Sequence, residues 1–180
     1  KNNINKNANE NEEGVQSNDL SNRAGQFENL IKSINFFQSL QDQEIGELLK
    51  NITLLEYKVG QSISVDNIIQ NKVIIILEGT ARLLSTSKDN LETVAKLEQG
   101  SIIGLGSLLR NSPCERVSAS SVVKALVIPE DFIINTYKNN KNFEKDCNLI
   151  LLPCEILALS QIIANRSNRT DLNIKVIFNN

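Results

Sequence analysis

The residues best suited to chemistry lie between Gly104 and Ala119, in the stretch GLGSLLRNSPCERVSA. A glycine opens a short apolar turn, a proline follows it, and Arg116 stands just before small residues. An arginine offers a planar fork of donors that suits phosphate oxygens. The stretch therefore raises the question of whether it holds a phosphate group.

Catalytic chemistry is poorly supported by the rest of the chain. There is no histidine among the 180 residues, which removes Ser–His and Cys–His nucleophile pairs and most zinc sites. No paired carboxylates stand at a glycine-marked cleft. We therefore expect no catalytic residue and no metal site, and we do not expect an enzyme.

Charge and hydropathy narrow the choice of partners. The chain carries 19 basic and 21 acidic residues, for a net charge of -2, and the basic residues are spread along it. A nucleic-acid partner would favour a basic stripe, so none is expected. No run approaches the roughly 20 apolar residues of a membrane span, so we expect no direct membrane insertion.

The cysteines Cys114, Cys147 and Cys154 form an odd set without a CxxC pair. On one helix, Cys147 and Cys154 would lie roughly 10 Å apart along the axis, too far for a disulfide. Buried, unreactive thiols in a reducing cytosol are favoured over a redox role. The expected location is therefore cytoplasmic.

The pattern of apolar residues divides the chain into three parts. Residues 1–24 are almost without apolar side chains, which predicts a disordered linker. Residues 25–165 are expected to form one domain, with helices over 27–50, strands over 54–129 and helices over 130–165. Residues 166–180 are expected to be a tail leading to a missing downstream domain.

Turn signals set the expected elements within that domain. Asp42 is expected to cap the second helix. Short strands are expected around Gly60, on both sides of a hairpin at Glu78-Gly79, and around Gly100. Short strands with regular turns are typical of a sandwich or small barrel, so the expected fold is mainly β with flanking helices.

The C-terminal helical region carries a proline and an apolar stripe. Pro153 predicts two segments or a kinked helix rather than one straight helix. The stripe comprises Leu149, Leu152, Ile156, Leu159 and Ile163. Such a stripe usually packs inside its own domain, and a partner helix is the alternative.

Several segments together resemble the cyclic nucleotide-binding domain family. They are Gly60, VIIILEGTARLL, LEQGSIIG, SLLRNSPCERVSAS and ALVIPEDF, and the resemblance covers roughly residues 36–143. It implies an eight-stranded double-stranded β-helix, a jelly-roll-like β-roll, with N-terminal helices and C-terminal lid helices. It also implies that a short helix from Gly104 to Arg110 presents its N-terminus to the cyclic phosphate of cAMP or cGMP.

The resemblance carries a set of ligand-binding residues onto this chain for the phosphate and ribose. They are Gly104, Leu105, Gly106, Ser107, Arg116 and Val117. Family members that bind nucleotide have a glutamate where this chain has Leu105, and an unpaired ribose hydroxyl costs about 1–3 kcal/mol.

Some of these residues depart from the family pattern, and others have a simpler structural explanation. Arg116 stands further along than the commonest spacing, behind Cys114 and Glu115, and a surface ion pair with Glu115 or another acid would also explain it. Gly104 would be needed for the turn alone. Leu105 is expected to fill the pocket. Ser107 is adequately explained by local hydrogen bonds.

A second resemblance concerns SLLRNSPCE, LEGTARLL and LLPCEILAL. These segments resemble the N-terminal cyclic nucleotide-binding-like domain of bacterial peptidase-containing ABC exporters, the type I secretion class. The favoured function is a non-catalytic regulatory module of such an exporter, with a degenerate nucleotide pocket and no cofactor. The alternative is a functional cAMP or cGMP sensor that controls an attached output domain.

The remaining expectations concern partners. The favoured ones are other domains of the same polypeptide, and the family resemblance implies a homodimer through the C-terminal helices. A transcription factor is disfavoured, because only about fifteen residues follow Asn165, too few for a helix-turn-helix.

Overall fold

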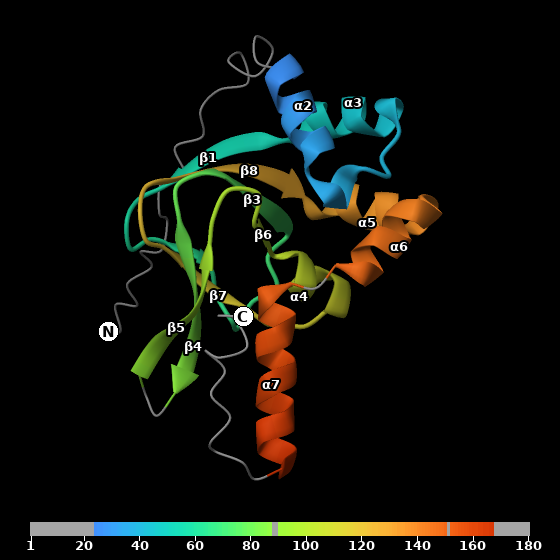
Figure 1. The fold of residues 1–180 in the computed structure, drawn as a ribbon. Helices are drawn as coiled ribbons and strands as arrows, with labels where there is room; N and C mark the ends of the chain where they lie inside the picture. Colours follow the sequence, from blue (N-terminus) through green and yellow to red (C-terminus); the bar gives the residue numbers. More distant parts are fainter. Residues whose placement is uncertain (1–23, 88–89, 151, 168–180) are drawn as a thin grey trace, which may run out of the picture.

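A computed structural model describes residues 24–87, 90–150 and 152–167. The described chain contains eight strands in two four-stranded antiparallel sheets, with orders β1-β8-β3-β6 and β2-β7-β4-β5. The two sheets form the roll in Figure 1, and most helices gather at one end of it. The expected mainly β fold with flanking helices is confirmed.

The strands are short and follow the turn signals. Their bounds are β1 Thr53–Tyr57, β2 Ser62–Ser64, β3 Lys72–Glu78, β4 Ala81–Ser87, β5 Asn90–Leu97, β6 Ile102–Ile103, β7 Arg116–Ala119 and β8 Val123–Pro129. The helices are α2 Ala24–Ser33, the 3-10 helix η1 Asn35–Phe37, α3 Asp42–Asn51, α4 Leu105–Arg110, α5 Glu130–Asn139, α6 Lys141–Leu149 and α7 Pro153–Ser167.

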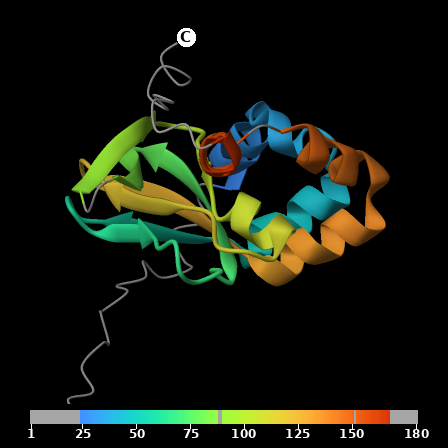
Figure 2. The same ribbon diagram turned by 90° about the horizontal axis from the view of Figure 1, so that it is seen from below.

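Strand β3 contains a continuous run of apolar residues. Its residues 73–76, VIII, are all buried. Successive side chains of a strand point to opposite faces, so an uninterrupted buried run requires cover on both faces. The interior of the roll covers one face, and α5 contacts β3. Figure 2 shows the roll and the group of helices side by side.

An aromatic cluster joins the N-terminal and C-terminal helices. The ring centroids of Phe36 and Phe143 lie 4.9 Å apart, and those of Phe36 and Phe37 lie 4.7 Å apart. All three side chains are buried. Burial of such rings contributes strongly to a core, so η1 and α6 hold the two ends of the domain together.

The expected cap at Asp42 is wrong by one residue. Gln41 is the N-cap of α3, and the backbone N–H of Gln41 donates to a carboxylate oxygen of Glu44 at 2.8 Å. Asp42 is the first helical residue, where its negative charge still favours the helix start.

The expected hairpin at Glu78-Gly79 is also wrong, although the turn itself is present. Strand β3 pairs with β6 and β8, whereas β4 pairs with β5 and β7. The chain therefore changes sheets at Gly79, which has φ +87°. Adjacent apolar runs separated by a tight turn predict pairing, but here the roll takes the two strands into different sheets.

Pro153 divides the C-terminal region as expected, since α6 ends at Leu149 and α7 begins at Pro153. The expected apolar stripe does not form one buried face. Leu149 is 71% exposed and Leu159 is 57% exposed. The break before Pro153 changes the helical phase, and Cys154, Leu157 and Ser160 face inward instead.

Two expectations lie largely outside the described residues. The linker predicted over 1–24 has only its last residue described, as the start of α2. The tail predicted over 166–180 has only its first two residues described, as the end of α7. Within residues 24–87, 90–150 and 152–167, no helix is long and apolar enough to cross a membrane.

Replacing Gly79 with alanine tests the change of sheets. A Cβ atom at residue 79 would clash with the carbonyl oxygen of Val122, and residue 79 has φ +87°, which disfavours any side chain. We expect Gly79→Ala to lower the free energy of unfolding by at least about 3 kcal/mol, measured by guanidinium denaturation.

The matched control is Gly46→Ala within α3, where a Cβ atom meets nothing within 4 Å. It should raise stability by about 0.5–1 kcal/mol, because alanine suits a helix better than glycine. Equal effects of the two substitutions would contradict the tight crossing.

Candidate functional site: the start of α4

The loop that enters α4 requires a glycine. Gly104 is the N-cap of α4 with φ +91°, and its Cβ position lies 2.6 Å from the carbonyl oxygen of Lys72. A side chain at residue 104 would therefore meet both backbone strain and the neighbouring strand β3. This geometry accounts for Gly104 by the turn alone.

Leu105 is the first residue of α4. Its side chain is fully buried and belongs to the hydrophobic core. A ribose hydroxyl would gain no hydrogen-bond acceptor from this residue. The structure therefore places Leu105 within the packing of the roll, in keeping with the expectation that it fills space.

The carboxylate of Glu115 lies at the start of α4. The backbone N–H of Gly104 donates to Oε1 of Glu115 at 2.5 Å, and the Glu115 side chain is buried. Backbone N–H groups at a helix start are the donors that anions use. Here a carboxylate of the chain itself is bound to the amide that enters α4.

Burial raises the pKa of Glu115 to about 7. Loss of hydration is the main cause, and the charge of the neighbouring Cys114 thiolate raises it further. The Gly104 hydrogen bond acts in the opposite direction because it favours the ionised carboxylate. Glu115 is therefore poorly hydrated, and hydrogen bonds such as the one from Gly104 stabilise its ionised form.

Arg116 is held by an acid other than its sequence neighbour. Its Nη2 lies 3.0 Å from Oδ1 of Asp66, and its Nε donates to the same oxygen at 3.2 Å. Both side chains are partly exposed. Asp66 belongs to the loop between β2 and β3, so the pair joins that loop to β7.

The remaining predicted site residues are covered by protein. Val117 is buried in β7, where it pairs with Leu83 of β4. Oγ of the buried Ser107 accepts a hydrogen bond from the backbone N–H of Cys114 at 3.1 Å. A Cβ atom at Gly106 would lie 2.9 Å from Sγ of Cys154.

The first turn of α7 covers α4. Arg110 at the end of α4 donates through Nε to Oε1 of Glu155 at 2.9 Å, and its Nη2 lies 2.7 Å from the same oxygen. Oε2 of Glu155 accepts from the backbone N–H of Leu152 at 3.2 Å. Figure 1 shows the start of α7 beside α4 and the rest of α7 extending away from it.

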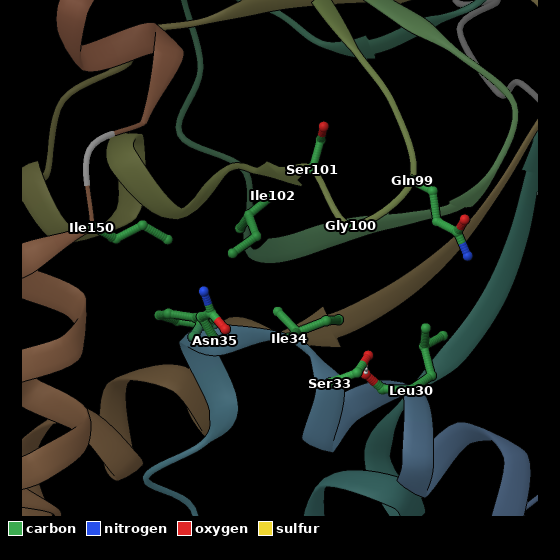
Figure 3. A pocket seen from close by; sticks show the side chains of 10 residues that line it. Leu30, Ser33, Ile34, Asn35, Gln99, Gly100, Ser101, Ile102 and Ile150 are labelled. Atoms are coloured by element: carbon green, nitrogen blue, oxygen red, sulfur yellow. Dashed lines mark hydrogen bonds between the residues drawn. The ribbon is translucent and has the colours of Figure 1, made fainter.

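A separate hollow of about 530 Å³ lies between the N-terminal helices and the turn before β6. Figure 3 shows Leu30, Ile34, Gln99, Ile102 and Ile150 around it. Its lining carries neither a charged residue nor any of the six predicted site residues. This hollow therefore offers no cation to a phosphate.

Three comparisons with known proteins bear on this geometry. Residues 54–140 match the family model described as the cyclic nucleotide-binding domain. A search of the curated proteins found no match.

Solved structures with the same fold include a cyclic nucleotide-binding domain from Methylobacillus flagellatus. It has 16% identity and a TM-score of 0.58, with 82% of this chain and 84% of that chain covered. Another is the regulatory domain of Toxoplasma gondii PKA with cAMP, at 14% identity and TM-score 0.59, covering 67% of this chain and 45% of that chain.

A third is a mutant regulatory subunit of a cAMP-independent protein kinase A from Trypanosoma brucei, bound to cAMP in its A site. It has 20% identity and a TM-score of 0.57, with 71% of this chain and 52% of that chain covered. The chain thus spans about half the length of the two kinase regulatory proteins. The chain therefore shares its fold with these solved structures, and residues 54–140 of it match the cyclic nucleotide-binding domain model.

Sequence reasoning missed three features of this site. Glu115 was expected beside Arg116, but its carboxylate is buried and accepts a hydrogen bond from Gly104. Asp66 was overlooked as the partner of Arg116. The approach of Cys154 to α4 had no sequence signal, because it depends on how α7 packs.

The pKa of Glu115 predicts a specific pH dependence of stability. The folded-state value of about 7 lies above the ordinary value of 4.5, so the folded protein holds a proton that the unfolded chain releases. The resulting stability is present below pH 4.5 and is lost as the pH rises to about 7. Between pH 5 and 7 the loss amounts to about 2 kcal/mol.

The measurement is guanidinium denaturation of the wild type and of Glu115→Gln at pH 5, 6 and 7. The difference between the two proteins isolates Glu115 from the other titrating groups, and it should change by about 2 kcal/mol over this range. The exposed residue Glu47 supplies the control Glu47→Gln, whose difference from wild type should stay constant. A constant difference for Glu115→Gln would refute the buried carboxylate.

Proposed function

We propose that this chain is a non-catalytic regulatory module whose cyclic-nucleotide pocket is degenerate. The observation that carries the proposal is the hydrogen bond from the Gly104 amide to the buried Glu115 carboxylate. A cyclic phosphate bound at the start of α4 would need that amide. Above pH 7, where Glu115 is ionised, the phosphate would also bring a second negative charge next to that carboxylate, in a place where water screens poorly.

Two further contacts support the proposal. Arg116, the expected phosphate ligand, already has Asp66 as its counter-ion. Leu105 is buried in the core and offers no acceptor to a ribose. A ligand would thus have to break an ion pair, displace a carboxylate and leave a hydroxyl unpaired.

Calorimetric titration with cAMP and with cGMP tests this function. We expect no binding heat at ligand concentrations up to about 1 mM, where a binding free energy of about -4 kcal/mol would be detected. A cooperative thermal transition of the same sample would show that the protein is folded. Micromolar binding of either nucleotide would overturn the proposal.

A guanosine titration adds a necessary comparison, because one structure with this fold, from Trypanosoma cruzi, is described as bound to guanosine. A nucleoside lacks the phosphate that Glu115 would repel. Binding of guanosine would show a nucleoside receptor rather than a degenerate pocket. The same silence is expected for guanosine as for the cyclic nucleotides.

Leu105→Glu provides the matched variant. It supplies the carboxylate that nucleotide-binding relatives use, but it puts an acid into the core at the residue after Gly104, whose amide binds Glu115. We expect it to add little or no binding of cAMP and to lower the free energy of unfolding by about 3 kcal/mol or more. Strong gain of cAMP binding from this single change would mean that the pocket is otherwise intact.

The alternative function is a cAMP or cGMP sensor. The match of residues 54–140 to the cyclic nucleotide-binding domain favours it. A sensor requires a ligand that binds one position of the C-terminal helices more tightly than another. The same titrations decide between the two functions.

The exporter setting belongs to the same proposal. The segments SLLRNSPCE, LEGTARLL and LLPCEILAL support a cytosolic regulatory domain attached to a peptidase-containing ABC exporter. Its partners would then be other domains of the same polypeptide. Sequencing of the complete gene tests this: peptidase and membrane regions after this domain are expected, and an unrelated neighbour would remove the exporter from the proposal.

A further inference from the structure

Two cysteines that are far apart in the sequence meet at α4. Cys114 precedes β7, and Cys154 is the second residue of α7. The Cβ position of Gly106 lies 2.9 Å from Sγ of Cys154 and 3.3 Å from Sγ of Cys114. Both sulfur atoms thus border the same small space above Gly106, and neither cysteine is in a disulfide.

The surroundings favour ionisation of Cys114 before Cys154. The hydrogen bond from Cys154 is the main cause that lowers the pKa of Cys114 to about 6, and Ser107 and the charge of Arg110 lower it further. The interaction with Cys114 is the main cause that raises the pKa of Cys154, and burial and the charges of Glu115 and Glu155 raise it further. Cys114 is therefore the better nucleophile of the pair.

Ser107 is placed to assist the thiolate. Its Oγ accepts the backbone N–H of Cys114 at 3.1 Å and lies 3.4 Å from Sγ of the same residue. Because the amide uses an oxygen lone pair, the hydroxyl hydrogen is available to the sulfur. Cys114 is also the more accessible thiol to an oxidant, because it is partly exposed whereas Cys154 is 3% exposed.

We propose that Cys114 and Cys154 are a redox modification site, which closes to a disulfide under peroxide and fastens the first turn of α7 to the loop before β7. The proposal does not depend on whether a nucleotide binds.

The chemistry balances with hydrogen peroxide as the oxidant. The Cys114 thiolate attacks one peroxide oxygen, the O–O bond breaks, and the hydroxide that leaves takes a proton to become water. Sγ of Cys154 then attacks Sγ of the Cys114 sulfenic acid, loses its proton, and expels a second water. Two thiols are oxidised to one disulfide while one peroxide is reduced to two waters.

The disulfide would change how α7 is attached to the rest of the domain. In the reduced protein, its first turn is joined to α4 by the Arg110–Glu155 ion pair and by the packing of Leu152 and Cys154. Arg110 is partly exposed, so this ion pair contributes modestly. A disulfide would add a covalent link between segments that lie 40 positions apart in the sequence.

The first test counts thiols in the whole chain. Treatment with a small excess of hydrogen peroxide should reduce the number that react with Ellman's reagent in denaturant from three to one. Peptide mapping should then find Cys114 joined to Cys154, and dithiothreitol should restore all three thiols. Three remaining thiols, intermolecular disulfides alone, or sulfinic acid at Cys114 without the link would each overturn the proposal.

The second test measures the effect on α7. Oxidation should raise the thermal midpoint by about 10 °C. It should also slow amide hydrogen exchange in the first turns of α7 at least about tenfold, relative to the reduced protein. An unchanged exchange rate in a protein shown to carry the disulfide would refute the fastening of α7.

Matched variants separate the pair from the third cysteine. Cys147 is buried in α6, and burial raises the pKa of its thiol to about 12. Cys147→Ser should keep the peroxide-induced rise in thermal midpoint, whereas Cys114→Ser and Cys154→Ser should each abolish it. Because these variants could differ in stability, each is compared with its own dithiothreitol-treated sample. A retained rise in either member of the pair would contradict the assignment.

Discussion

The hydrogen bond between the Gly104 amide and the buried Glu115 carboxylate is the constraint around which the site is organised. A helix that starts inside a roll exposes backbone donors to a place with little water, and those donors require an acceptor. In this chain the acceptor comes from the segment that leads into β7. The carboxylate is stable there only because the amide partly offsets its loss of hydration.

The same place couples two distant parts of the chain. Glu115 and Cys114 stand side by side before β7, and α7 brings Cys154 and Glu155 against them and against Arg110. Four ionisable groups thus share one small region with the guanidinium of Arg110. Their protonation states depend on one another, so a change at the start of α7 alters the electrostatics at the start of α4.

Most of the fold could be predicted from local patterns. The short strands, the glycine turns and the break at Pro153 each depend on a few neighbouring residues, and the structure has them where the sequence indicates. Strand partners could not be predicted in the same way. The runs around Gly79 suggest a hairpin, yet pairing is decided by how two sheets close around one core.

The site was less predictable, for reasons that individual residues make clear. Glu115 and Arg116 are neighbours in the sequence, but the Glu115 carboxylate accepts from the Gly104 amide and Arg116 pairs with Asp66. Choosing between Asp66 and another acid required knowledge of the loop after β2. Leu149 and Leu159 have helical spacing in the sequence, but they lie in the separate helices α6 and α7, and both are exposed.

The order of strands also has a kinetic consequence. Thr53 of β1 pairs with Val127 of β8, and Ser62 of β2 pairs with Ser118 of β7. The first two strands of the chain therefore cannot pair until the last two strands are in place. Strands β4 and β5, which are consecutive in the chain and pair with each other, can form early. Because the pairs β1–β8 and β2–β7 join distant parts of the chain, the native fold is rich in non-local contacts, and we expect the domain to fold more slowly than a helical bundle of equal length.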